Sequence, residues 1–421
     1  MSVVRIPEIR RRIVFTVLAL IVYRLGSHIP APGVDVQATK DVGGQFGGNG
    51  VLGLLNTFTG GGLSQLTIFA LGVTPYVTAS IIVQLLTVVV PSLEKLQKDG
   101  EVGVERITQY TRYLTIGLAL AQAIGYTFLF RSLGTQAGES PITTFDAPHV
   151  LPIVVTLTAG TAFVMWLGEL ITQRGIGNGI SLIIFAGIIA RLPHGVQAWW
   201  TSPDPVFKVI MPMVVLAVVA GVVFVQDGQR RIPIQYARRI IGRRMSDGHR
   251  TYLPLRVNSA GVIPVIFAAS LIAVPPTIAQ MINTPATTSL ANAFNSNGVP
   301  YLVGQSLLII VFTYFYTAVT FNPVDQADNL KRYGGFIPGV RPGHGTAVFL
   351  DRVLARLTLP GAIYLALIAA LPAILIDQTT ATFSFGGTSL LIVIGVALDT
   401  VRQAQAQAVM RNYGGYLKQA A

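Results

Sequence analysis

The stretch "LGLLNTFTGGGLSQLTIFAL", residues Leu52–Leu71, decides how the rest of the chain is threaded. It is apolar and has the length of about 20 residues that a helix needs to cross a bilayer core of about 30 Å. However, three consecutive glycines (Gly60–Gly62) interrupt it, and it contains the polar residues Asn56 and Gln65. If this segment crosses a membrane, the orientation of every later segment is inverted.

The composition indicates an integral membrane protein. Hydrophobic residues make up 52% of the 421 residues and charged residues only 11%, whereas a soluble domain carries about 25% charged residues. The absence of cysteine excludes disulfides, thiolate metal sites and cysteine nucleophiles. Arg5 and Arg10–Arg12 precede the first apolar run, but no A-x-A-like site follows it, so we expect no cleaved signal peptide.

Ten apolar runs are candidates for membrane-spanning helices. They are Ile13–His28, Val73–Val90, Tyr113–Phe130, Val150–Ile171, Gly177–Leu192, Val209–Val225, Val257–Ile278, Val303–Phe321, Leu357–Ile376 and Gly387–Val401. If Leu52–Leu71 does not cross, both termini and the loops after the second, fourth, sixth and eighth runs share one side. Only five basic residues then lie on the other side (Arg24, Lys40, Arg131, Arg191 and Lys208), against the remaining 25 of 30.

This charge asymmetry predicts the orientation. Loops rich in Lys and Arg face the cytoplasm, so we expect cytoplasmic termini and a segment Leu52–Leu71 that enters from the outer side and returns. If this segment crossed the membrane, every later loop would change sides and the basic residues would be distributed over both sides. Because interrupted backbone at membrane depth is tolerated only inside protein or beside a water-filled cavity, the sequence predicts a cavity with this segment in its outer half.

Two pairs of short motifs suggest an internal duplication. "GVTPYVTASII" (Gly72–Ile82) matches "GVIPVIFAASL" (Gly261–Leu271), and "GISLII" (Gly179–Ile184) matches "GTSLLI" (Gly387–Ile392). They lie in the second and fifth runs of each group of five. Since five is odd, the two halves would be inverted, with the working site near the midplane between them. Matches this short also arise by chance in apolar sequence.

Motifs for chemistry are missing from the sequence. It contains no G-x-x-x-x-G-K-[ST] and no H-E-x-x-H, and all five histidines lie at the ends of apolar runs or in loops. Asp399 lies within the last run, but Arg402 follows three residues later, so we expect an ion pair. These features favour a gated conduit over an enzyme. An ion-coupled transporter, which would need ionisable groups at the midplane, and an insertase with only a hydrophilic groove are the alternatives.

Five blocks resemble the SecY family, the channel subunits of the bacterial Sec translocon, and the likeness extends from Arg5 to about Lys418. The blocks begin "TPYVTASIIVQLLTVVVPSLEKL", "WLGELITQRGIGNGISLII", "VNSAGVIPVIFAAS", "FNPVDQADNLKRYGGFIPGVRPG" and "FGGTSLLIVIGVALD". The resemblance implies an all-α multi-pass membrane protein with ten transmembrane helices in two inverted pseudo-symmetric halves and a re-entrant plug helix. The halves would be residues 1–192 and 193–421, with the plug at about 52–71 and cytoplasmic loops at about 226–256 and 322–352.

The resemblance also implies the site residues of a passive channel for unfolded preproteins and signal peptides, without enzymatic activity or cofactor. The pore ring would be Val77, Ile81, Ile180, Ile184, Ile266 and Ile392. The plug would include Asn56, Thr57, Gly60, Gly61, Gly62 and Leu66, and the lateral gate, through which helices leave for the lipid, would include Gln84 and Asn258. Val77 is smaller than the isoleucine common in the family. Ordinary helix packing is the alternative for the ring residues, and local backbone capping for Gln84 and Asn258.

The loop "RRIPIQYARRIIGRRMSDGHR" (Arg230–Arg250) contains seven arginines and is expected to face the cytoplasm. The resemblance implies docking of ribosomes and of the motor ATPase SecA there, and SecE-like and SecG-like membrane subunits as partners in the plasma membrane. The docking residues would be Arg238, Arg239, Arg243, Arg244 and, in "GVRPG", Arg341. Arginines bind the phosphates of ribosomal RNA without regard to sequence; anionic lipid headgroups are the competing partner.

Reporter fusions test the orientation. Because the asymmetry of basic residues requires ten crossings, a periplasm-active reporter fused after Arg131 should be active and one fused after Arg244 inactive. A cytoplasm-active reporter should show the reverse pattern. The opposite reading at either site would contradict the ten-span topology.

Overall fold

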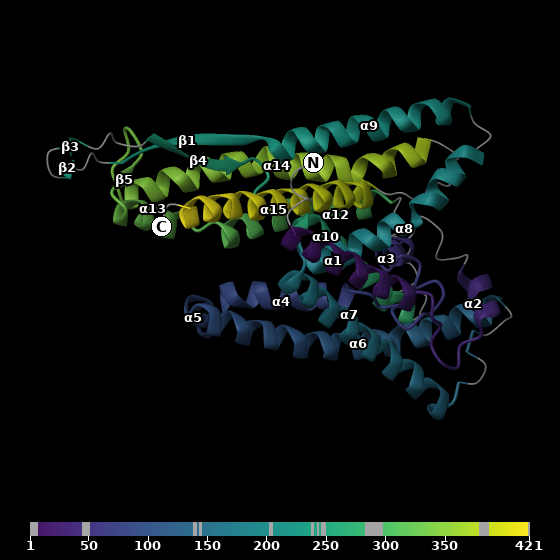
Figure 1. The fold of residues 1–421 in the computed structure, drawn as a ribbon. Coiled ribbons are helices and arrows are strands. Elements are labelled where there is room, and N and C mark those ends of the chain that lie inside the picture. The colour runs from purple at the N-terminus through teal and green to yellow at the C-terminus, as the bar shows by residue number, and fades with distance from the viewer. Residues whose placement is uncertain are drawn as a thin grey trace.

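The computed structural model describes residues 7–43, 51–137, 141–142, 145–201, 205–236, 240–241, 244–245, 250–282, 298–378 and 387–419. It is mostly helical (Figure 1). The helices of the first part are α1 (Pro7–Gly26), α2 (Val36–Gly43), α3 (Val51–Phe58), α4 (Thr74–Val89), α5 (Pro91–Lys98), α6 (Glu101–Ala137), α7 (Ala147–Arg174) and α8 (Gly179–Thr201). Those of the second part are α9 (Pro205–Asp227), α10 (Ile263–Ile282), α12 (Val299–Thr320), α13 (Pro323–Arg332), α14 (His344–Gln378) and α15 (Gly387–Gln419). The strands are β1 (Gln229–Tyr236), β2 (Ile240–Ile241), β3 (Arg244–Met245), β4 (Arg250–Arg256) and β5 (Gly335–Phe336).

Each of the ten predicted apolar runs coincides with a helix, namely α1, α4, α6 to α10, α12, α14 and α15. In the described part of the chain, six helices are long and apolar enough to cross a membrane, or seven if the bent pair α4 and α5 forms one span. That pair bends by 99° at Val90, which is extended and precedes Pro91, because a residue before proline is disfavoured in the helical region. Large apolar side chains face outward, such as Phe224, which is 80% exposed, and Leu216, which is 68% exposed.

The duplicated motifs adopt the same local structure in both places. Gly72 (φ +55°) and Gly261 (φ +64°) both take the left-handed conformation, and each precedes a helix whose second residue is proline. This gives a helix start two residues after the glycine, so the run predicted from Val257 becomes helical only at Ile263. Likewise, Gly179 and Gly387 are the first residues of α8 and α15.

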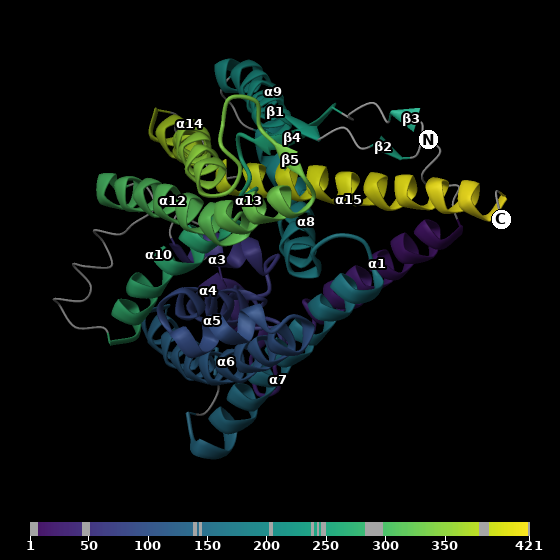
Figure 2. The same cartoon turned by 90° about the vertical axis from the view of Figure 1, so that its left-hand side faces the viewer.

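The helices form two groups with a seam between them (Figure 2). In one group, α6 packs on α4 and α7; in the other, α14 packs on α12 and α15. Across the seam α10 contacts α4 and α6, and α8 contacts α15. The largest cluster of buried apolar side chains lies where these helices meet and includes residues of α1, α3, α4, α7, α8, α9, α10, α12, α14 and α15.

The segment Leu52–Leu71 forms the short helix α3 followed by a series of turns. After these turns the backbone N–H of Ile68 donates to the carbonyl of Ile29 at 3.0 Å, and that of Ala31 donates to the carbonyl of Leu66 at 3.0 Å. Residues 29–31 follow the C-terminal end of α1. The segment thus returns to that end of α1 and does not run beside it as a continuous helix.

The expectation of an all-α protein is wrong for the loop at about 226–256. Strand β1 pairs antiparallel with β4, with Gln229 opposite Arg256, and pairs on its other edge with β5. The sequence carried the signal, since Ile232 and Ile234 are buried and alternate with the less buried Arg231, Pro233 and Gln235, and Leu255 of the partner strand is buried too. The sheet joins the two predicted cytoplasmic loops, and it lies with α5, α13 and the end of α15 at one end of the molecule (Figure 1).

Candidate functional site

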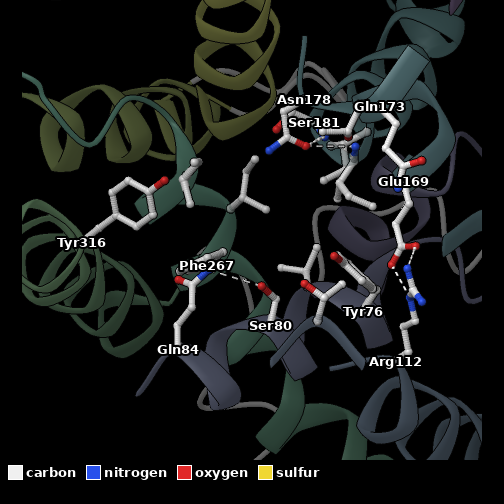
Figure 3. A pocket seen from close by; sticks show the side chains of 17 residues that line it. Tyr76, Ser80, Gln84, Arg112, Glu169, Gln173, Asn178, Ser181, Phe267 and Tyr316 are labelled. Carbon is white, nitrogen blue, oxygen red and sulfur yellow. Dashed lines mark hydrogen bonds and ion pairs between the residues drawn. The ribbon is translucent and has the colours of Figure 1, made fainter. Parts of the chain in front are cut away.

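A cavity of about 360 Å³ opens between the two groups of helices. Residues of α4, α6, α7, α8, α10 and α12 line it, together with Asn178 before α8 (Figure 3). Its walls are mixed: Tyr76, Ser80, Gln84 and Ser181 contribute polar atoms, whereas Phe267 and the ring isoleucines contribute apolar surface. The polar part of this lining can hydrogen-bond water or polypeptide backbone, whereas the apolar part cannot.

The six predicted ring residues belong to, or pack against, one apolar cluster beside this cavity. Val77, Ile180, Ile184 and Ile266 line it, whereas Ile81 and Ile392 do not. Five of the six are at most 4% exposed, and Ile180 packs against them while partly buried. They come from α4, α8, α10 and α15, so four helices from two distant parts of the sequence meet in one apolar cluster. Their role as a gate remains a prediction.

The predicted plug residues lie in the same region. Phe58, the last residue of α3, is 4% exposed and belongs to the same apolar cluster as the ring. α3 contacts α8 and α10. Among the described residues that line the cavity there is none from 51–71, so four of the ring residues lie at the cavity surface and the plug residues do not.

Polar groups of the plug are paired internally. The side-chain Oδ1 of Asn56, which is 1% exposed, accepts a hydrogen bond from the backbone N–H of Ser64 at 3.0 Å. Its backbone carbonyl accepts one from Gly61 at 2.8 Å. Gly60 (φ +68°) and Gly61 (φ +94°) provide the left-handed turn that brings these groups together, and Leu66 (φ +47°) is fully buried in the next turn. The glycines that interrupt the sequence therefore form a compact turn.

Gly187 of α8 allows the plug to approach closely. A Cβ atom at this position would lie 2.6 Å from the carbonyl oxygen of Phe58 and 3.1 Å from the backbone N of Gly60. Both neighbours are backbone atoms, which cannot rotate away as a side chain can. The sequence analysis did not find this residue, because a single glycine in an apolar run gives no sign of what it contacts.

The cavity wall also contains an ion pair that the sequence did not predict. Arg112 of α6 binds Glu169 of α7 in a bidentate arrangement, with Nε to Oε1 at 2.9 Å and Nη2 to Oε2 at 2.6 Å (Figure 3). The two residues are 57 positions apart, so their pairing could not be predicted from spacing. The bond fixes α6 against α7 on the side of the cavity away from Tyr316, as Figure 3 shows.

The two predicted lateral-gate residues make local hydrogen bonds. Gln84 Nε2 donates to Ser80 Oγ at 3.4 Å within α4, and Asn258 Nδ2 donates to the carbonyl of Gly261 at 3.0 Å. No hydrogen bond joins Gln84 to Asn258, and within the described chain the side-chain oxygens of both are buried without a partner. The local alternative thus accounts for the bonds that are formed, and the gate role is left as a prediction.

The expected ion pair between Asp399 and Arg402 is confirmed, with Nη1 and Oδ1 3.7 Å apart. Arg402 also donates to the carbonyl of Gln226 at 2.8 Å and to the carboxylate of Asp227. It therefore holds the C-terminal end of α9 against the middle of α15. A cavity of about 410 Å³ lies beside this group, lined among others by Arg256, Ile263 and Tyr316.

The structure places only part of the predicted docking set. Arg341 is exposed in a turn between β5 and α14, where its carbonyl accepts from Thr346 Oγ1 at 3.0 Å. Gly339 (φ +82°) and Gly343 (φ +93°) on either side fix the turn. Arg244 begins β3, whereas Arg238, Arg239 and Arg243 lie outside the described residues.

Comparison with known proteins gives the family. The family model for SecY matches residues 67–401. The chain is 47% identical to the protein translocase subunit SecY of Streptomyces coelicolor, over 98% of both chains, and 48% identical to that of Mycobacterium bovis, over 99% of both. The chain belongs to the SecY family. This membership confirms a multi-pass membrane protein of the translocon and a channel subunit rather than an enzyme.

Solved structures agree with the fold of a SecY-family chain. One described as the structure of a protein conducting channel has a TM-score of 0.64 at 17% identity and covers 94% of this chain and 92% of that one. Sec61 in the canine ribosome-channel complex has a TM-score of 0.61 at 16% identity, with the same coverage. At such low identity these likenesses concern the fold alone.

The close contact at Gly187 gives a test of the plug packing. Gly187→Ala should lower the stability of the purified protein by about 1–3 kcal/mol, because the added methyl group forces backbone apart in a packed core. Thermal or denaturant unfolding in detergent would measure this. Gly221→Ala in α9 is the matched control: its Cβ meets nothing within 4 Å, so alanine should be neutral or stabilise the helix by up to about 1 kcal/mol. Equal effects of the two substitutions would contradict the close packing.

Proposed function

We propose that this chain is the pore-forming subunit of a plasma-membrane protein translocon, and that unfolded polypeptides pass through the ring at Ile81, Ile184, Ile266 and Ile392. The observation that carries the proposal is the meeting of these side chains, from four helices, beside a partly polar cavity and in one apolar cluster with Phe58. The pore is passive: the energy for movement comes from SecA or from the translating ribosome.

The ring acts as a seal that yields to a chain. A constriction lined by apolar side chains excludes water and ions, and the residues 52–71 below it add a second barrier while the channel is at rest. Isoleucine and valine side chains contact a passing segment without demanding a particular partner, since dispersion contacts are not directional. A seal of this kind suits a channel whose substrates differ in every residue.

The lateral gate lies between α4 and α10. Supporting this, α10 contacts α4 along the seam between the two groups of helices, and the oxygens of Gln84 and Asn258 near this seam are buried without partners. An unpaired buried oxygen costs about 1–3 kcal/mol, so the closed seam is less stable than a fully paired one. Signal peptides and transmembrane helices would leave the pore here for the lipid.

The topology we propose is ten transmembrane helices in two inverted halves, residues 1–192 and 193–421, with both termini in the cytoplasm. It rests on the positive charge asymmetry and on the identical local structure of the paired motifs at Gly72 and Gly261. The end of the molecule that contains α5, α13 and the sheet would then be cytoplasmic (Figure 1).

We place the partners at that end. The canine Sec61 relative was solved in a ribosome-channel complex, and the hairpin β1–β4 carries arginines suited to ribosomal RNA phosphates. We assign Arg238, Arg239, Arg243 and Arg244 to this contact and Arg341 to SecA. SecE-like and SecG-like subunits would complete the channel, and anionic lipids would neutralise basic residues that do not touch a partner.

Polar substitutions in the ring test the seal. Ile266→Asn and Ile392→Asn should raise the resting ion conductance of the channel complex in planar bilayers by about tenfold or more, because wetting the constriction becomes easier. Precursors with defective signal sequences should also be exported. Ile153→Asn is the control, since Ile153 is fully buried in a separate cluster. This substitution should reduce the stability of the protein without raising its resting conductance. If the ring variants behave like this control, the ring is ordinary packing.

Charge reversal at Arg341 tests the docking turn. Arg341→Glu should reduce SecA-driven translocation into vesicles by about 100-fold or more, because a repulsive charge replaces a cation fixed by its turn. The amount of folded protein in the membrane should stay unchanged. Arg332→Glu, at an exposed arginine that ends α13, should have little effect. Equal loss in both variants would show that Arg341 contributes only general positive charge.

A further inference from the structure

Two of the few basic residues on the charge-poor side approach the plug. Arg191 of α8 reaches Thr57 in the last turn of α3, and Arg24 of α1 reaches Gly60 just after this helix. We propose that these two arginines form a cationic latch that holds the plug in its closed position. The proposal rests on the proposed function, in which residues 52–71 seal the resting channel.

The contacts join residues far apart in the sequence. Arg24 Nη1 donates to the carbonyl oxygen of Gly60 at 2.8 Å, across 36 positions. Arg191 Nη1 donates to Thr57 Oγ1 at 3.2 Å, across 134 positions. Each guanidinium therefore ties a long helix to the plug, and neither bond can be explained as local capping of its own helix.

The glycine at position 60 is required by this arrangement. A Cβ atom there would lie 2.6 Å from Arg24 Nη1 and 3.0 Å from the Cα of Gly187. Any other residue would push the guanidinium, or the plug itself, out of place. The run of glycines in the sequence thus serves the approach of the arginine as well as the turn.

The end of α3 attracts cations, although the two guanidinium groups are partly desolvated and repel each other. The carbonyl groups at the C-terminal end of a helix carry a partial negative charge, which attracts basic side chains; here the helix is α3, which ends at Phe58. Arg24 and Arg191 are both half-buried, and among the described residues neither forms an ion pair with a carboxylate. The two arginines thus donate to polar atoms of the plug, and Arg24 also donates to the neighbouring Ser27.

A latch of this kind is strong but reversible. A hydrogen bond to a charged group changes an equilibrium by about ten- to a hundredfold, and it opens without the larger cost of breaking a buried pair of opposite charges. The neutral bond from Tyr23 to the carbonyl of Thr59, at 3.4 Å, is long by comparison. We therefore expect Arg24 and Arg191 to set most of the polar contribution to plug closure.

Conductance of the complete channel complex in planar bilayers tests the latch. Arg24→Gln and Arg191→Gln should each raise the resting conductance about tenfold, and the double substitution more, because each removes one charged hydrogen bond. Lys208→Gln is the matched control, since Lys208 is an exposed basic residue of the same charge-poor side; its conductance should equal that of the unmodified channel. Arg24→Lys, which keeps a charged donor, should restore most of the closure.

A second set of variants separates the latch from the plug. On a background that lacks Thr57–Leu66, the two glutamine substitutions should add no conductance. Thr57→Val removes the acceptor of Arg191, and on this background Arg191→Gln should have no further effect. If the glutamine variants leak no more than Lys208→Gln while the deletion leaks, the latch is refuted and the plug stands. If the deletion itself does not leak, the proposed sealing role fails. Additional leak on the deletion background would refute the latch too, since the arginines would act elsewhere.

Discussion

The structure depends on one buried apolar cluster, which contains Phe58 of the glycine-interrupted segment and isoleucines of four helices. All of these side chains except that of Ile180 are almost fully buried, although the helices that carry them come from distant parts of the chain. Burial of a large apolar side chain contributes about 1.5–3 kcal/mol, so the cluster holds the two groups of helices together around α3. In the function proposed above, the same cluster closes the conduit, so opening the pore would weaken the centre of the fold.

Small residues and a few polar bonds stabilise the fold outside this cluster. Gly187 lets the backbone of the plug lie directly on α8, and Gly60 makes room for Arg24. The bidentate pair Arg112–Glu169 and the contacts of Arg402 fix helices on either side of the seam without crossing it. As a result polar bonds fix helices within each group, whereas α4 and α10 meet at the seam through side chains of the apolar cluster, which suits the lateral gate proposed above.

The docking end is built separately from the pore. The sheet joins the loop after α9 to the loop after α13 over a small core of Ile232, Leu255 and Leu350. The sheet lies at one end of the molecule (Figure 1), and Arg341 is exposed in the turn between β5 and α14. A force applied there by a partner would reach the seam through α10, which begins shortly after β4. Separation of this kind allows partners to change without altering the ring.

The sequence by itself determined the apolar segments, and it predicted the returning segment and, through the resemblance, the ring, because bilayer length, charge asymmetry and motif repeats are properties of consecutive residues. It also predicted the ion pair of Asp399 and Arg402, which are one helical turn apart. Only the tertiary structure decided the contacts of Arg24, Arg191, Gly187 and the Arg112–Glu169 pair. These depend on which helix faces join across 36 to 134 positions, and no local pattern encodes that choice. The hairpin lies between the two cases: its alternation was visible in the sequence, but its pairing with β5 required the folded chain.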